Sequence, residues 1–197
     1  MKITKISEQI KNPNRVSIFL DGKYSFSLNL DQLLDEKLKI SQDIDEQALN
    51  DLKKKSDLGK MRLRTIEWLY IRPRSAKELT TYLRSKKLDP DEINSLISNL
   101  QLKGYQNDEQ FTQWWFSQRQ AKHKSNRYIV NELRAKGISS EVLNKYYEEH
   151  VIDDKTAIQE LITKKRLLQK YSDKQKLYSY LLRQGFSYDL IKEVVNQ

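Results

Sequence analysis

The sequence predicts a mainly α-helical protein: three tandem three-helix repeats in an elongated, curved array, preceded by a small N-terminal β-hairpin/α module. Two observations lead to this fold class. Apolar and polar residues alternate only near the N-terminus, on both sides of an Asp-Gly pair, which is typical of a hairpin. From residue 58 onward, apolar residues recur at helical spacing, and one pattern of caps, apolar stripes and breaks appears three times.

The hairpin is expected within "RVSIFLDGKYSFSL". Alternate positions on both sides of Asp21-Gly22 are apolar: Val16, Ile18 and Leu20 before the pair, and Tyr24, Phe26 and Leu28 after it. Gly tolerates the positive φ that such a tight turn demands. The preceding "ITKISEQI" is a candidate third strand. Helices over 30–38 and 45–56 are expected to cover one face of the sheet, because so small a sheet is unstable with both faces wet. Residues 1–56 are the predicted N-terminal module.

The helical part contains one unit used three times. Helix-start positions 50 and 48 residues apart carry side chains whose oxygens cap free backbone N–H groups: Ser75, Ser125 and Asp173. One apolar stripe follows each cap, at Leu79/Leu83, Ile129/Leu133 and Leu177/Leu181. Each stripe ends at a break, at Lys87, Gly137 and Gly185, where Gly suits a left-handed residue. An apolar residue and a second cap come next, at Leu88-Asp89, Ile138-Ser139 and Phe186-Ser187.

Two further helices complete each unit. The third helices share apolar residues at i, i+3 and i+4: Ile93/Leu96/Ile97, Leu143/Tyr146/Tyr147 and Ile191/Val194/Val195. The first helices are expected in "MRLRTIEWLYIR", "DEQFTQWWFSQRQAK" and "DKTAIQELITKKRLLQK". The predicted repeats are therefore residues 57–107, 108–152 and 153–197, each a small module stacked on its neighbours.

Composition limits the function. Of the 197 residues, 38% are hydrophobic and 32% are charged, which favours small modules. The net charge of +9 favours an anionic partner, either nucleic acid or an acidic protein, and the helical part carries most of the excess. Cys is absent, which excludes a thiolate nucleophile and a Cys-based zinc site. No apolar run suits a membrane span or a signal peptide, so a cytosolic protein is expected.

Catalytic motifs are missing from the sequence. His123 and His150 are far apart in polar surroundings and are expected to be surface residues without a catalytic or metal-binding role. The five Gly residues form neither a phosphate-binding loop nor a nucleophile elbow. The acidic pairs Asp91-Glu92 and Asp153-Asp154 suit helix N-termini. We therefore expect no enzyme activity, no cofactor and no metal.

Basic residues are densest between Arg119 and Lys136 in the middle repeat. This stretch contains one acid, Glu132, and six basic residues: Arg119, Lys122, Lys124, Arg127, Arg134 and Lys136. They form either a binding surface for an anionic partner or an ordinary solvated helix face with a basic loop. "RPR" (Arg72 and Arg74) and "KKR" (Lys164, Lys165 and Arg166) are candidates to extend the surface. "KKK" at 53–55 suits a helix C-terminus, where cations oppose the dipole.

Aromatic residues allow two interpretations. Trp114, Trp115 and the tyrosines could stack on unpaired bases. Helical spacing instead favours a buried stripe of Phe111, Trp114 and Trp115, and it assigns Tyr146 and Tyr147 to the core.

The middle repeat also carries a family resemblance, in Asp108, Phe111, Arg119, Ile129, Glu132-Leu133 and Lys136-Gly137-Ile138. With the preceding "RPRSAKELTTYLRSKKLDPDEI" and the hairpin, which is similar to the Gram-positive version, this pattern resembles the RecX family of bacterial recombination regulators. The resemblance covers essentially the whole chain. One departure is the polar "KHKSN" before the second helix, where the family often has a Gly.

The resemblance implies a non-catalytic regulator of recombination, DNA repair and the SOS response. Such a protein binds the RecA recombinase and its filament on single-stranded DNA, and inhibits filament growth, ATP hydrolysis and strand exchange. It implies a cytoplasmic monomer without membrane contact, and it leaves open whether bare DNA is also bound. The alternative is a duplex DNA-binding protein that resembles a helix-turn-helix domain. The third helices disfavour this alternative because they are acidic or mixed, whereas a recognition helix is rich in Arg, Asn and Gln.

Overall fold

The structure is a computed structural model that describes residues 1–150 and 153–196. The described residues contain three strands and eleven helices. They form two compact units, Met1–Trp68 and Leu69–Gln197. Helix α2 (Glu46–Ile71) contains the boundary between the two units.

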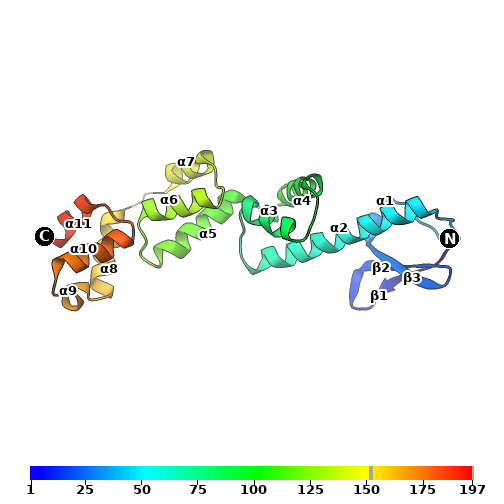
Figure 1. Cartoon of the computed structure of the whole chain (residues 1–197), viewed down its shortest axis with the longest axis horizontal. Helices are drawn as coiled ribbons and strands as arrows, with labels where there is room; N and C mark the ends of the chain where they lie inside the picture. The colour runs from blue at the N-terminus through cyan, green and yellow to red at the C-terminus, as the bar shows by residue number, and fades with distance from the viewer. Residues whose placement is uncertain (151–152, 197) are drawn as a thin grey trace. The chain divides into compact units, whose positions relative to one another are not determined.

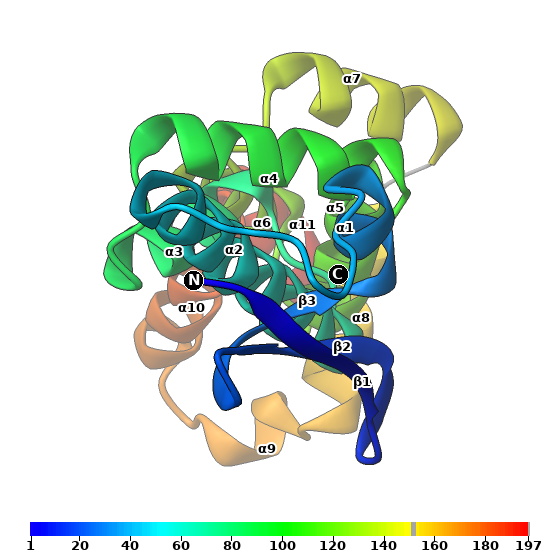
Figure 2. The ribbon, with the colours of Figure 1, turned by 90° about the vertical axis from the view of Figure 1, so that its right-hand side faces the viewer.

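The N-terminal unit is built on a three-stranded antiparallel sheet in the order β1–β2–β3 (Figure 2). The strands are β1 (Ile3–Gln9), β2 (Asn12–Leu20) and β3 (Lys23–Asn29). Asp21 (φ +47°) and Gly22 (φ +82°) join β2 to β3. Positive φ at both central residues is the conformation that suits the right-handed twist of a hairpin. The hairpin and the candidate third strand are both confirmed.

Helices cover one face of this sheet, as predicted. Apolar side chains of the three strands pack into one core with residues of α2 and of the segment that precedes it: Ile3, Val16, Ile18, Leu20, Phe26, Leu28, Ile44, Leu49 and Leu52. Leu33 of α1 (Leu30–Asp35) packs against the same core. The side chain of Ser56 in α2 donates to the carbonyl oxygen of Ser27 in β3, which fixes the helix on the sheet.

The structure corrects one expectation about α2. Separate helices were expected over 45–56 and from residue 61, but the two segments form one unbroken helix (Figure 1). Gly59 is the only residue between them that favours a break, but it lies within the helix. A Cβ atom at Gly59 would lie 2.7 Å from Gln32 Oε1, so the small residue lets α1 approach closely.

The helices after α2 follow the three-fold pattern. Repeat 1 continues with α3 (Ala76–Ser85) and α4 (Pro90–Leu102). Repeat 2 consists of α5 (Asp108–Gln120), α6 (Asn126–Ala135) and α7 (Ser140–Glu149). Repeat 3 consists of α8 (Asp154–Lys164), α9 (Leu167–Lys170), α10 (Lys174–Arg183) and α11 (Tyr188–Val195).

Equivalent residues of the repeats have equivalent environments. The side chains of Ser75, Ser125 and Asp173 each accept a hydrogen bond from a backbone N–H in the first turn of the following helix. Leu79, Ile129 and Leu177 are all buried in the core. The three break residues all have positive φ, at +63° for Lys87, +84° for Gly137 and +99° for Gly185. The predicted register of the repeats is therefore confirmed.

The first helix of repeat 3 differs from the prediction. It was expected to run unbroken to Lys170, but it ends at Lys164, and Arg166 adopts a left-handed conformation (φ +48°) before α9. Ile158, Leu161 and Ile162 define the buried face of α8. At about 100° per residue, a continued helix would turn Leu167 away from that face. The break returns Leu167 to the core, where it is buried.

Adjacent repeats meet at two similar junctions within the C-terminal unit. At the first junction, the Ser75 side chain donates to the carbonyl oxygen of Lys136 (2.8 Å), and the Ala76 N–H donates to Asp108 (2.9 Å). At the second junction, the Ser125 N–H donates to the carbonyl oxygen of Gln184 (3.1 Å), and the Asn126 N–H donates to Asp154 (2.9 Å). In both, the capped start of a second helix meets the break of the next repeat and an Asp at the start of that repeat's first helix.

Close contact at the junctions explains why Gly stands at two of the three breaks. A Cβ atom would lie 2.9 Å from Lys77 Cβ at Gly137, and 2.4 Å from Ser125 Oγ at Gly185. These distances are too short for any larger residue without a shift of its neighbour. The equivalent Lys87 of repeat 1 is exposed, so a side chain is accommodated there despite the positive φ.

The substitution Gly185→Ala should therefore destabilise the protein more than Gly104→Ala does. Gly104 has a similar φ (+73°), but a Cβ atom there would have no neighbour within 4 Å. The left-handed conformation alone should cost about 1–2 kcal/mol in both variants, and overpacking at the junction should add about 1–3 kcal/mol in Gly185→Ala. Urea denaturation measures both values. Equal losses in the two variants would contradict a tight second junction.

Candidate functional site

Two of the predicted basic residues, Arg72 and Lys136, take part in the first junction. Glu78 of α3 accepts hydrogen bonds from Arg72 Nη1 (3.0 Å) and Nη2 (3.2 Å), and from Lys136 Nζ (2.9 Å). Arg72 and Lys136 belong to different repeats, so one carboxylate links both sides of the junction. Their side chains are only 26% and 24% exposed.

Trp115 connects the same cluster to α6. Its indole Nε1 donates to Glu132 Oε2 (2.9 Å), and Arg119 Nε donates to the same oxygen (2.6 Å). The Arg119 guanidinium lies 4.3 Å from the centre of the Trp115 ring, and Lys136 Nζ lies 4.2 Å from it. Both distances are within the range of cation–π attraction. Arg119 and Lys136 therefore stabilise the repeat and its junction directly.

The charges around Glu78 affect its ionisation. Burial alone would raise the pKa of Glu78, but the hydrogen bonds and positive charges of Arg72 and Lys136 outweigh burial and hold the pKa below its ordinary value. The ionised form is therefore favoured in the folded protein.

Arg72 and Arg74 border a hollow of about 300 Å³ that is also lined by Tyr70, Tyr105 and Trp114. The Arg72 guanidinium lies 5.2 Å from the Trp114 ring. Arg74 is half-buried, and its pKa is lowered by burial and by the charge of Arg72. The pair "RPR" thus lies beside the first junction, and its charges are partly shielded from solvent.

Three predicted residues of the middle repeat face solvent: Lys122, Arg127 and Arg134. None of them forms an ion pair within residues 1–150 and 153–196. Lys124 is half-buried, with its Nζ 4.3 Å from the centre of the Tyr128 ring. Arg127 and Arg134 are seven residues apart on α6 and share one face of the helix.

The "KKR" residues lie near the basic loop of the middle repeat. The pKa of His123 is lowered by burial and by the positive charge of Lys164, with a further contribution from Lys165. His123 stands between Lys122 and Lys124, so the second junction brings basic residues of two repeats together. All three of Lys164, Lys165 and Arg166 are exposed, although Lys164 pairs with Glu160 (3.0 Å).

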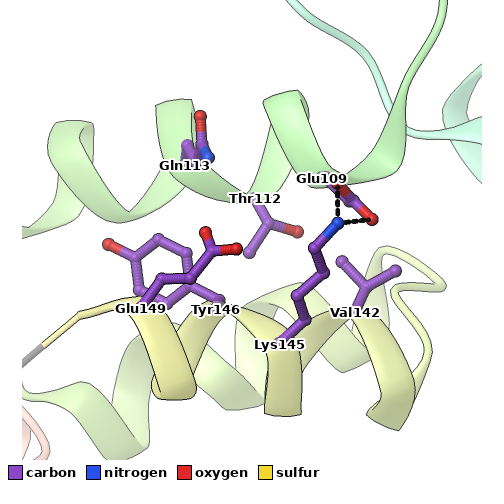
Figure 3. Close-up of a pocket in the computed structure, with 7 residues that line it drawn as sticks. All are labelled: Glu109, Thr112, Gln113, Val142, Lys145, Tyr146 and Glu149. Carbon is purple, nitrogen blue, oxygen red and sulfur yellow. Dashed lines mark hydrogen bonds and ion pairs between the residues drawn. The ribbon is translucent and has the colours of Figure 1, made fainter.

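A small hollow between α5 and α7 offers little room for a ligand (Figure 3). Its volume is about 10 Å³, which is about the space of one water molecule. Lys145 Nζ donates to both carboxylate oxygens of Glu109 (2.8 Å each) across the hollow. Tyr146 and Glu149 are among the other residues that line it. The described part of the chain contains no group of three or more His, Asp or Glu residues that could hold a metal ion.

The aromatic residues of the middle repeat pack largely as predicted. Phe111, Trp115 and Tyr146 are buried in one core, whereas Trp114 and Tyr147 are half-buried at its edge. Sequence reasoning assigned no role to Glu78. Glu78 accepts its hydrogen bond from Lys136, which lies 58 residues later in the sequence. Reasoning from local spacing does not detect so distant a contact.

Three-helix modules that stack through repeated junctions and carry basic side chains on their surface define the class: a tandem-repeat protein. Family models match in three places. The RecX N-terminal domain matches residues 1–45, the second three-helix domain of RecX matches 107–145, and the third three-helix domain matches 153–195.

Curated relatives named "Regulatory protein RecX" match the whole chain. The protein of Bacillus subtilis is 32% identical over 99% of this chain and 76% of its own length, and that of Listeria monocytogenes is 29% identical over 100% and 76%. A crystal structure of a regulatory protein RecX shares the fold, with a TM-score of 0.79, 20% identity, and coverage of 100% of this chain and 99% of that chain. RecX from Lactobacillus salivarius has a TM-score of 0.60 and 25% identity, over 71% of this chain and 95% of its own. The chain belongs to the RecX family of regulatory proteins.

None of the helices in the described residues combines the length and the apolar character that crossing a lipid bilayer requires.

The depressed pKa of Glu78 predicts a dependence of stability on pH. A carboxyl group whose pKa is lower in the folded state stabilises the protein above its unfolded pKa, about 4.3 for Glu, and loses this effect as the pH falls through the folded value. Glu78→Gln should lower the free energy of unfolding by about 1–3 kcal/mol at pH 7. The difference between variant and wild type should shrink as the pH falls below about 4.3.

Urea denaturation at several pH values measures this difference. Glu148→Gln is the matched control, because Glu148 is exposed and forms no ion pair within the described residues. A Glu78→Gln effect that is independent of pH would show that the carboxylate charge does not hold the junction.

Proposed function

We propose that this chain is a regulator of the RecA recombinase in homologous recombination, DNA repair and the SOS response. It binds RecA and the RecA filament on single-stranded DNA, and inhibits filament growth, ATP hydrolysis and strand exchange. It acts in the cytoplasm as a monomer and is not an enzyme. The similarity to regulatory proteins named RecX over 99% of the chain is the observation that carries the proposal.

The proposed contact residues for the phosphates of filament-bound DNA are the half-buried Lys124 and six exposed cations: Lys122, Arg127, Arg134, Lys164, Lys165 and Arg166. Exposed Lys and Arg can approach phosphates and release counterions from DNA. Arg72, Arg74, Arg119 and Lys136, which the sequence also predicted as contact residues, have a supporting role in this proposal. They lie at or beside the first junction, where Glu78 and Glu132 already balance part of their charge.

The alternative function, recognition of duplex DNA through a helix in the major groove, has less support than binding to the RecA filament. The third helices of the repeats carry acidic residues in their first turns: Asp91 and Glu92 in α4, Glu141 in α7, and Asp189 in α11. Base contacts in the major groove come mainly from the N-terminal part of a recognition helix. Carboxylates at that end would lie close to DNA phosphates and repel them.

The function is tested by titrating the purified protein into a RecA ATPase assay on single-stranded DNA. We expect a dose-dependent fall in the rate of ATP hydrolysis, together with shorter filaments in electron micrographs. Heat-denatured protein at the same concentrations is the control. An unchanged rate at severalfold excess over RecA would overturn the proposal.

The contact residues are tested by the triple variant Lys122→Glu/Arg127→Glu/Arg134→Glu. It leaves the ion pair of Arg119 intact, so folding should survive, because exposed substitutions usually change stability by less than about 0.5 kcal/mol each. Binding to the filament should be lost. Wild-type affinity should fall linearly with the logarithm of salt concentration, with a slope near about −0.7 per phosphate contacted on single strands.

The matched control reverses three exposed lysines of the N-terminal unit, Lys39, Lys53 and Lys54, which changes the net charge by the same amount. If both triple variants lose affinity equally, the effect comes from net charge rather than from this surface. If the first variant melts normally and still inhibits RecA at wild-type concentrations, these residues are an ordinary solvated face.

A further inference from the structure

Repeat 3 contains an open groove between α10 and α11 with a volume of about 530 Å³. The side chains that matter for its chemistry are two tyrosines, one leucine, two lysines and one asparagine: Tyr178, Tyr188, Leu182, Lys174, Lys192 and Asn196. None of the residues that line the groove is acidic. The groove is therefore positively charged and partly apolar.

The apolar residues of the groove are unusually exposed. Tyr188 is 56% exposed and Leu182 is 44% exposed. The rings of Tyr178 and Tyr188 meet edge to face, with their centres 5.5 Å apart, and Asn196 Nδ2 lies 3.3 Å from the Tyr178 hydroxyl oxygen. Exposed apolar side chains that gather at one place on a soluble protein indicate an interaction site.

The lysines of the groove lack acidic partners. Neither Lys174 nor Lys192 forms an ion pair within the described residues. Lys174 Nζ lies 3.3 Å from Asn196 Oδ1, which is a neutral acceptor. Two uncompensated positive charges beside apolar rings suit an occupant that carries both a carboxylate and an apolar group.

The other two repeats show that the fold does not require these side chains. Tyr178, Leu182 and Tyr188 align with three residues in each of the other copies: Thr80, Arg84 and Pro90 in repeat 1, and Val130, Arg134 and Ser140 in repeat 2. Lys192 aligns with Asn94 and Asn144. The same helix pair thus forms with smaller or polar residues at these positions. Of the three copies, only repeat 3 carries the two tyrosines and the two lysines at these positions.

The junctions indicate which kind of partner the groove accepts. In both junctions, the first residue after the N-cap of the second helix donates its backbone N–H to a carboxylate. Ala76 donates to Asp108, and Asn126 donates to Asp154. Each of these aspartates lies at the start of a helix. The equivalent residue in repeat 3 is Lys174, which lines the groove. A protein carboxylate at a helix start is therefore the ligand that this position binds elsewhere in the chain.

We propose that the α10–α11 groove binds an acidic helical segment of a partner protein. A carboxylate at the start of that segment lies near Lys174 and Lys192, and an apolar side chain next to it packs on Tyr178, Leu182 and Tyr188. The inference deepens the proposed function, because RecA is the partner to be tested. It assigns recognition of protein to α10 and α11 of repeat 3, separately from the proposed phosphate contacts in the middle repeat and at Lys164, Lys165 and Arg166.

Two groove variants test the proposal. Tyr178→Val/Leu182→Arg/Tyr188→Ser installs the residues that repeat 2 carries at the same positions, so the helix pair should still form. Lys174→Glu/Lys192→Glu reverses the two charges. The matched control Lys176→Glu/Arg183→Glu makes the same charge change at exposed positions of α10 that do not line the groove. Circular dichroism and thermal melting establish that each variant is folded.

Binding is measured by biolayer interferometry against two probes: RecA without DNA, and fluorescently labelled oligo-dT without RecA. Both groove variants should bind RecA at least about tenfold more weakly than wild type, which corresponds to about 1.4 kcal/mol. The control should bind RecA within about twofold of wild type, and oligo-dT binding should be the same for the groove variants and the control.

Three other outcomes would each contradict a different part of the proposal. Wild-type affinity for RecA in both groove variants overturns the groove assignment and leaves the proposed function standing. Loss of oligo-dT binding with unchanged RecA binding shows that the tyrosines stack on bases and that the occupant is nucleic acid. Failure of the wild type to bind RecA in any assay contradicts the proposed function and, with it, this partner.

Discussion

Close backbone approach at the two junctions is the constraint on which the C-terminal unit depends. Gly137 and Gly185 each lie so near the preceding repeat that a Cβ atom would overlap it. That proximity brings the Ser75 side chain and the Ser125 N–H within hydrogen-bond distance of carbonyl oxygens in the next repeat. Capping of a helix and docking of a repeat therefore use the same few atoms, so the local fold and the arrangement of neighbouring repeats are coupled.

This coupling determines which basic residues of the sequence remain free to bind an anionic partner. The stretch from Arg119 to Lys136 is dense in cations, but its first and last members lie on the Trp115 ring, and each pairs with a glutamate. Among the described basic residues of this stretch, only Lys122, Arg127 and Arg134 are exposed and form no ion pair. Charge density in a sequence is therefore a poor measure of charge density on a surface when repeats dock through ion pairs.

The sequence predicted the features that depend on local chemistry. The Asp21-Gly22 turn, the caps at Ser75 and Ser125, and the break at Gly185 were recognised because each requires particular residue types at fixed spacing. The continuous α2 was missed because Gly59 favours a break in sequence, whereas in the fold it lies within the helix and close to Gln32. The turn at Arg166 was missed because it depends on which face of α8 is buried. The role of Glu78 was also missed because its partner Lys136 is distant in sequence. For the candidate site, sequence reasoning identified the cations but not which of them face solvent.

Each junction joins two unlike surfaces, the capped start of one second helix and the glycine break of the next repeat. Contacts between unlike surfaces are heterologous and do not close on themselves as a two-fold contact does. A chain built in this way has polarity: repeat 1 carries a break surface at Lys87, and repeat 3 carries a capped helix start at Lys174. Gene duplication could therefore lengthen such an array by whole repeats without redesign of any internal contact.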